Sequence, residues 1–147
     1  MSLSGVMALL ILSCYGLTAI AALGFGITYL LTPTFMPYHA QALGLGWDEL
    51  PANLQVLILA LLRVAGGGLC AASVAVLTLL IGPFRQGQRW AYQAVPVVCL
   101  LVVLPTLWAV WSVQRQTPGS PPLGLVGLCL GLILLGAGLS WGRGIAQ

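Results

Sequence analysis

Four long apolar stretches, which together hold one of the seven charged residues, constrain this chain more than any other feature of its sequence. Its 147 residues include two acidic residues and five arginines, and no lysine. A stretch of about 20 apolar residues is long enough to cross a lipid bilayer as a helix. The mean hydropathy of +1.06 and the hydrophobic fraction of 60% exclude an ordinary soluble domain.

The sequence therefore predicts an all-α membrane protein, a four-transmembrane-helix bundle in a single domain. Backbone polar groups in lipid must find hydrogen bonds within the spanning segment, and continuous apolar runs lack the alternation of a β-barrel. The first stretch lacks a basic n-region and is too long for a signal peptide, so we expect it to be retained. The spans are expected at residues 4–31, 53–82, 91–113 and 123–141.

Prolines are expected to set the end of one helix and the course of another. The second helix is expected to end at Gly82-Pro83, because proline cannot continue a helix and disfavours helical geometry just before it. Pro96 and Pro105 lie inside the third helix, which we therefore expect to be bent.

Small residues repeat along three of the helices, and such residues let helix backbones approach closely in lipid. We expect packing within the chain along these positions. They are Cys14, Thr18, Ala22 and Gly26 in the first helix, Gly67, Ala71 and Ala75 in the second, and Gly127, Gly131, Gly136 and Gly138 in the fourth.

Arginine placement predicts the orientation of the bundle. Arg85, Arg89 and Arg143 lie on the side of the N-terminus in a four-span chain, and Arg115 lies on the opposite side. Because arginines are in excess in cytoplasmic loops, both termini are expected in the cytoplasm of a bacterial cell, with the chain in its inner membrane. Arg85 and Arg89 with Trp90 suit anionic lipid headgroups, whereas no nucleic-acid footprint is present.

The first extracytoplasmic loop, residues 33–51, is long and apolar. Exposed aromatic and aliphatic side chains would make it adhesive in water, so we expect it to lie in the interface or fold back over the bundle. Asp48 is expected to cap the second helix, with Glu49 in its first turn, where negative charge is favourable.

The second helix is longer than a bilayer is thick. About 20 residues counted back from Pro83 reach Arg63, so residues 53–62 are expected to project beyond the hydrocarbon. Their side chains are apolar on all sides, and we expect the first loop or another protein to cover them. Arg63 itself either snorkels to the interface and braces the loop, or contacts a ligand beneath that loop.

Candidate chemistry is sparse, and the sequence predicts neither a catalytic residue nor a metal site. His39 is the single histidine, which leaves open one axial contact to a haem or chlorin and supports no other cofactor. The four cysteines fall one per span and are expected to fill helix contacts. The candidate residues for ligand or partner contact are Arg63, His39, Tyr38, Trp47, Asp48 and Glu49.

The layout of the chain resembles that of a known group of proteins. Four short spans, an apolar loop ending in Trp47-Asp48-Glu49-Leu50-Pro51, and the turn Pro-Phe-Arg-x-Gly-x-Arg-Trp at residues 83–90 are similar to small uncharacterised bacterial inner-membrane proteins of DoxX-like layout. The resemblance implies a fold and a location, and no catalytic residues.

Two functions follow as hypotheses. The first is a non-enzymatic membrane subunit that binds lipid and a larger membrane protein, such as a respiratory or photosynthetic complex, or a second copy of itself. The alternative is a ligand-binding or catalytic membrane protein with a pocket under residues 33–51, where Arg63 contacts an anionic or quinone-like molecule.

Overall fold

The computed structural model describes the backbone of residues 3–145 and the side chains of residues 5–141, so the side chain of Arg143 lies outside the described part. The helices are α1 (Leu3–Leu31), α2 (Pro37–Leu43), α3 (Ala52–Leu79), α4 (Arg89–Gln116) and α5 (Leu123–Ile145). A 3₁₀ turn, η1 (Trp47–Glu49), precedes α3, and a π turn, η2 (Leu80–Phe84), follows it. Four helices in the described residues are long and apolar enough to span a bilayer, which confirms the predicted all-α four-span bundle.

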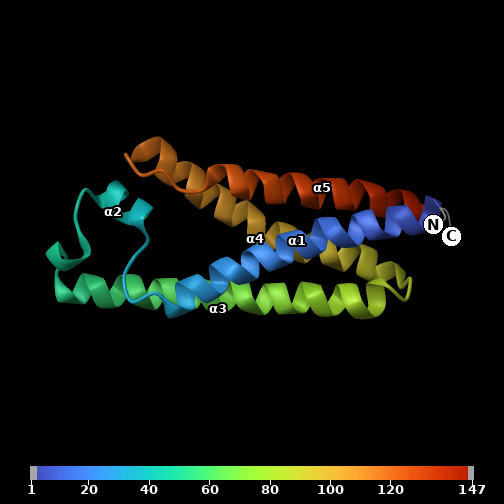
Figure 1. The fold of residues 1–147 in the computed structure, drawn as a ribbon, viewed down its shortest axis with the longest axis horizontal. Helices are drawn as coiled ribbons and strands as arrows, with labels where there is room; N and C mark the ends of the chain where they lie inside the picture. The colour runs from blue at the N-terminus through green and yellow to red at the C-terminus, as the bar shows by residue number, and fades with distance from the viewer. Residues whose placement is uncertain (1–2, 146–147) are drawn as a thin grey trace.

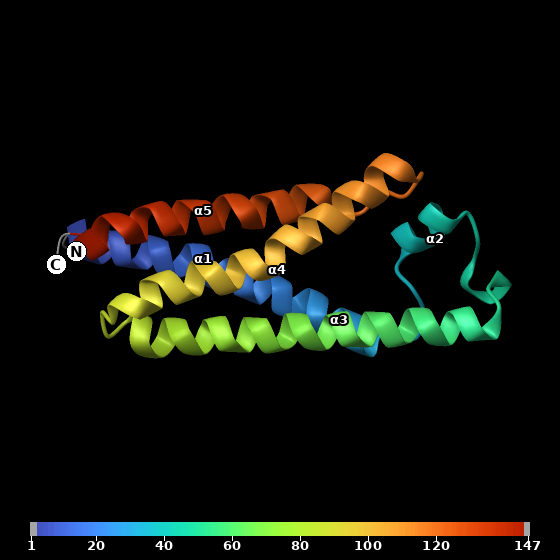
Figure 2. The same cartoon turned by 180° about the vertical axis from the view of Figure 1, so that it is seen from behind.

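The four long helices alternate in direction (Figure 1). The start of α1, the end of α5 and the α3–α4 turn lie at one end, and α2, η1 and the α4–α5 connection lie at the other. Figure 2 shows α4 running obliquely from the end of α3 to the start of α5. The helix is continuous through both Pro96 and Pro105. Because α1 also crosses between α5 and α3, the bundle is spread apart toward α2.

The α1–α3 crossing depends on two glycines. A Cβ added at Gly66 would lie 2.7 Å from the carbonyl oxygen of Gly26, and one added at Gly26 would lie 2.9 Å from that of Gly66. The predicted second-helix face of Gly67, Ala71 and Ala75 is wrong. No described atom beyond the immediate backbone lies within 4 Å of a Cβ at Gly67, and Ala71 and Ala75 are exposed. Small residues spaced by four occur on more than one face of this helix, so their spacing alone does not identify the face that packs against a neighbour.

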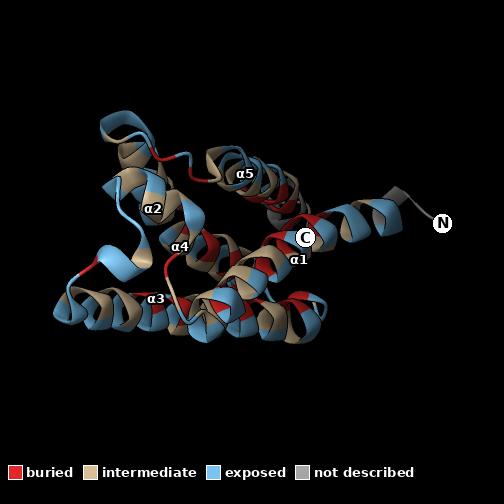
Figure 3. Ribbon diagram, turned by 60° about the vertical axis from the view of Figure 1, so that its left-hand side comes forward, coloured by how far each residue is buried: buried red, intermediate tan, exposed pale blue. Residues whose placement is uncertain are grey.

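The α1–α5 crossing places the ring of Tyr15 over Gly136, where a Cβ would lie 2.9 Å from the ring. Tyr15 is fully buried and belongs to the main core. Gly127 and Gly131 are exposed, so this part of the predicted fourth-helix face packs against no described residue of the chain. Figure 3 shows the buried segments of the long helices turned toward the bundle interior.

Both ends of α3 differ from the sequence-based expectation. The helix does not end at Gly82-Pro83, because η2 continues it through Pro83 to Phe84. A proline ring clashes with the carbonyl four residues earlier, and the wider π turn relieves that clash. At the other end, the N-cap is Pro51 and not Asp48.

The connection before α3 is fastened by a side chain within that helix. The side-chain amide of Gln55 donates to the carbonyl oxygens of Trp47 at 2.9 Å and Leu50 at 3.2 Å. Asp48 lies in η1, and the Glu49 carboxylate accepts the N–H of Gly46 rather than serving the first turn of α3.

The first third of α3 stands beyond the end of α1 (Figure 1). One side of it is covered, because Leu62 is buried in a cluster with Phe35 and Leu50, and Trp47 and Ile58 pack against that cluster. The other side is bare, with Val56, Leu57 and Leu61 exposed at 70%, 53% and 61%. The expectation that the connection folds back over the helix is therefore met on one side only.

Candidate functional site

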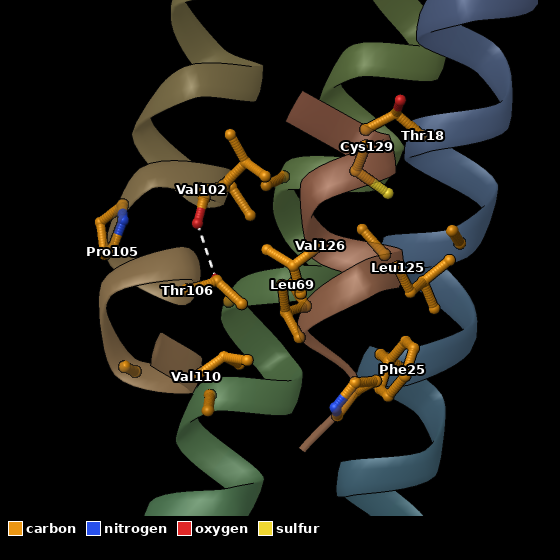
Figure 4. Close-up of a pocket in the computed structure, with 18 of the residues that line it drawn as sticks. Thr18, Phe25, Leu69, Val102, Pro105, Thr106, Val110, Leu125, Val126 and Cys129 are labelled. Carbon is orange, nitrogen blue, oxygen red and sulfur yellow. Dashed lines mark hydrogen bonds between the residues drawn. The ribbon is translucent and has the colours of Figure 1, made fainter. Parts of the chain in front are cut away.

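A cavity of about 540 Å³ lies between α1, α3, α4 and α5 on the side of the bundle near α2. Its walls are mainly alanine, valine and leucine, together with Phe25, Pro105 and Cys129 (Figure 4). Gly68, the last of three consecutive glycines at residues 66–68 of α3, also lines it. Binding sites for small molecules commonly have this size and this apolar lining. The spread of the four helices therefore creates a chamber in the part of the bundle that a bilayer would surround.

The hydroxyl groups along the walls are already used. Thr18 donates to the carbonyl oxygen of Cys14 at 3.0 Å, and Ser73 donates to that of Leu69 at 2.7 Å. Thr106 donates to the carbonyl oxygen of Val102 at 2.7 Å, as Figure 4 shows. Such bonds to the preceding turn satisfy a serine or threonine inside an apolar helix. These walls consequently present no spare hydroxyl donor to a bound molecule.

The polar groups gather where α2 closes the cavity. Tyr29 near the end of α1 and Tyr38 and His39 of α2 all line it. The hydroxyls of Tyr29 and Tyr38 are hydrogen-bonded to each other. Burial raises the pKa of Tyr38, and this hydrogen bond raises it further by a smaller amount. Because one hydroxyl of such a pair donates to the other, one O–H hydrogen is left for another acceptor.

The local sequence explains how α2 presents His39. Met36 is extended before Pro37, and proline is well suited to the first position of a helix. Gly44 ends α2 with φ of +68°, a conformation that favours glycine. The Met36 N–H donates to Nδ1 of His39 at 3.2 Å, which places the ring hydrogen of neutral His39 on Nε2. Burial lowers the pKa of His39, so the ring is uncharged near neutral pH.

The α4–α5 connection holds α2 in place over the cavity. The side-chain oxygen of Gln41 accepts hydrogen bonds from the Ser120 N–H at 3.2 Å and from the Ser120 hydroxyl at 2.9 Å. Gly119 is buried against α2, where a Cβ would lie 2.8 Å from the carbonyl oxygen of Tyr38. The groups at the polar end are thus positioned from two sides.

The structure brings together only part of the residue set singled out from the sequence. Tyr38 and His39 line the cavity, whereas Arg63 is exposed and is not among its described lining residues. Trp47 packs edge-on against Phe35, with ring centroids 5.2 Å apart, and Asp48 and Glu49 are exposed. The lipid-headgroup candidates Arg85, Arg89 and Trp90 are exposed at the opposite end of the bundle.

Sequence reasoning expected a pocket under residues 33–51, but it missed Tyr29 and the apolar walls that the four long helices supply. Tyr29 lies in an apolar span, nine residues before Tyr38, and the only sequence indication is a tyrosine near a helix end. The axial haem or chlorin contact through His39 stays a prediction, and it would require Nε2 of His39 to lose its ring hydrogen, because a coordinating nitrogen must carry none. No group of three metal-ligating side chains occurs among the described residues.

The chain matches no family model, no curated protein and no solved structure. The DoxX-like resemblance therefore stays a prediction, and the geometry alone supports a function.

Proposed function

We propose that the chain is a multi-pass protein of a bacterial inner membrane, with both termini cytoplasmic, that binds an uncharged lipid-soluble molecule inside the bundle. The cavity carries this proposal. Its volume of about 540 Å³ holds roughly 18 non-hydrogen atoms, if each takes the ~30 Å³ that a water molecule occupies in the liquid. Water solvates an apolar chamber of this kind poorly. Replacing water or lipid in the chamber by an apolar ligand is therefore favourable.

The position of Arg63 argues for an uncharged ligand in place of the anionic molecule expected from the sequence. Arg63 is exposed, and no charged side chain is among the described residues that line the cavity. A buried anion without a partner is strongly unfavourable. The Arg63 side chain instead suits the interface, where it snorkels from the edge of the bilayer.

Two adjacent alanines of α3 provide the test. Ala72 lines the cavity, whereas Ala71 is exposed and is not among its described lining residues. Ala72→Phe should fill part of the chamber and reduce binding of octadecane at least tenfold, as measured by native mass spectrometry from detergent micelles. Ala71→Phe adds the same side chain outside and should leave binding unchanged. Equal binding by both variants and the unsubstituted protein would contradict a cavity site.

A second function is favoured by the bare side of the first third of α3. Val56, Leu57 and Leu61 form an exposed apolar face where this helix stands beyond α1. A face of this kind outside the hydrocarbon needs an apolar neighbour, which supports an accessory subunit that docks on a larger membrane protein. Under this proposal, Arg85, Arg89 and Trp90 contact anionic lipid headgroups at the other end, at about 1 kcal/mol per arginine.

Mild purification followed by mass measurement tests the accessory role. Leu57→Ser together with Leu61→Ser should release a copurifying membrane protein. The matched pair Val97→Ser and Leu101→Ser changes exposed residues of α4, so it should retain that protein. A monomer that carries no other protein before any substitution would refute the docking role, and a doubled mass would identify a second copy as the occupant.

A further inference from the structure

We infer that the bound molecule carries an uncharged carbonyl group at its α2 end, which accepts hydrogen bonds from the Tyr29–Tyr38 pair and from His39. This inference rests on the proposed function and adds the chemistry of the polar end. A long apolar body would occupy the walls of the cavity, and the carbonyl oxygen would lie where α2 closes it.

The hydrogen-bonding capacity at this end is that of a donor site. The Tyr29–Tyr38 bond uses one of two hydroxyl hydrogens, and the second is available. His39 uses Nδ1 as an acceptor for the Met36 N–H, so its Nε2–H is also a donor. A carbonyl oxygen has two lone pairs and can accept from both. A pure hydrocarbon would leave these donors without partners when it displaces water, which is unfavourable.

The other end of the cavity supplies no competing polar recognition. Thr18, Ser73 and Thr106 direct their hydroxyl hydrogens to carbonyl oxygens of their own helices. The asymmetry predicts one orientation of the ligand, with its polar group toward α2. It also predicts a single polar group, because a second one at the far end would meet only apolar side chains and hydroxyls already used as donors.

The donors are held before any ligand arrives. The rings of Tyr38 and His39 are packed at an angle, with centroids 4.3 Å apart, and Phe35 packs edge-on against His39 with centroids 6.3 Å apart. Gly119 and the bonds between Gln41 and Ser120 fix α2 against the α4–α5 connection. Donors whose positions are set in advance lose little freedom on binding, which favours selectivity for the acceptor.

Three probes of about 18 non-hydrogen atoms each separate the possibilities, in keeping with the cavity volume. They are octadecane, methyl pentadecyl ketone and hexadecanoic acid, and each is titrated by native mass spectrometry into the full chain in detergent micelles. The ketone should bind about tenfold more tightly than octadecane, because it satisfies buried donors. The ionised acid should bind more weakly than the ketone at neutral pH.

Conservative variants locate the recognition. His39→Phe and the double variant Tyr29→Phe with Tyr38→Phe should each reduce the preference for the ketone several-fold and leave octadecane binding unchanged. Both tyrosines are replaced together because either one alone would keep one hydroxyl hydrogen for the ligand. Tyr92→Phe is the matched control, because Tyr92 packs on Phe84 at the other end of the bundle and should retain the preference. Unchanged octadecane binding also reports that each variant is folded.

The outcomes distinguish this inference from the proposed function. Equal binding of ketone and octadecane, tighter binding of the acid, or a ketone preference that survives both His39→Phe and the double tyrosine variant would overturn carbonyl recognition and leave the cavity site intact. Failure of every probe to bind would overturn the cavity site and the inference together.

Discussion

Two neighbouring glycines of α3 offer the sharpest test of the fold. Gly66→Ala places a Cβ 2.7 Å from the Gly26 oxygen and 3.0 Å from the Leu30 nitrogen. Both are backbone atoms, which cannot turn aside as a flexible side chain does, so α1 and α3 must separate. Overpacking of this kind costs about 1–3 kcal/mol of unfolding free energy. We expect a loss of that size in reversible unfolding in mixed detergent micelles, followed by tryptophan fluorescence or circular dichroism.

Gly67→Ala is the matched control, because an added Cβ there meets no described atom within 4 Å. Both substitutions remove a glycine from the same helix and gain the same helix propensity, up to ~1 kcal/mol. The difference between the two variants therefore isolates the cost of separating the helices, about 1–3 kcal/mol. If Gly67→Ala is as destabilising as Gly66→Ala, or more so, the rotation of α3 described above is wrong.

The remaining predictions concern the α1–α5 crossing and pH. Gly136→Ala should lower the unfolding free energy by about 1–3 kcal/mol because its Cβ meets the Tyr15 ring, whereas Gly138→Ala, which meets nothing, should not; equal effects in a denaturation series would contradict this packing. Burial lowers the pKa of His39 in the folded chain. As the pH falls, the unfolded chain therefore takes up a proton on His39 before the folded chain does, and stability should fall as pH drops below about 6.5. This slope should vanish in His39→Phe, because His39 is the single histidine of the chain; a slope that persists would assign it to another group.

Local patterns along the chain predicted the number, helical type and approximate bounds of the spans. The expected span at 123–141 begins where α5 begins, and the expected span at 4–31 ends where α1 ends. The projection of residues 53–62 beyond the hydrocarbon stays a prediction, and in the structure the first third of α3 stands beyond the end of α1. These properties depend on apolar content within one segment, because every backbone group in lipid must be satisfied inside that segment.

The candidate site was predictable only in part. Tyr38 and His39 stood out because they are adjacent to each other and because polar side chains are rare in this sequence. Arg63 stood out for the same reason, but the rotation of α3 turns it outward. Tyr29 was missed because its role depends on a hydrogen bond to another element.

Hydropathy by itself determined that this chain forms four apolar helices, since that pattern acts on each segment separately. The tertiary structure decided which face of each helix turns inward. It selected Gly66 over Gly67 at the α1–α3 crossing and brought Tyr29 to Tyr38 beside an apolar chamber. The reason is that helix rotation and crossing depend on how the shapes of distant segments fit together. Because residues on lipid-facing and on packed faces are both apolar, the hydropathy of one segment does not indicate which of its faces packs.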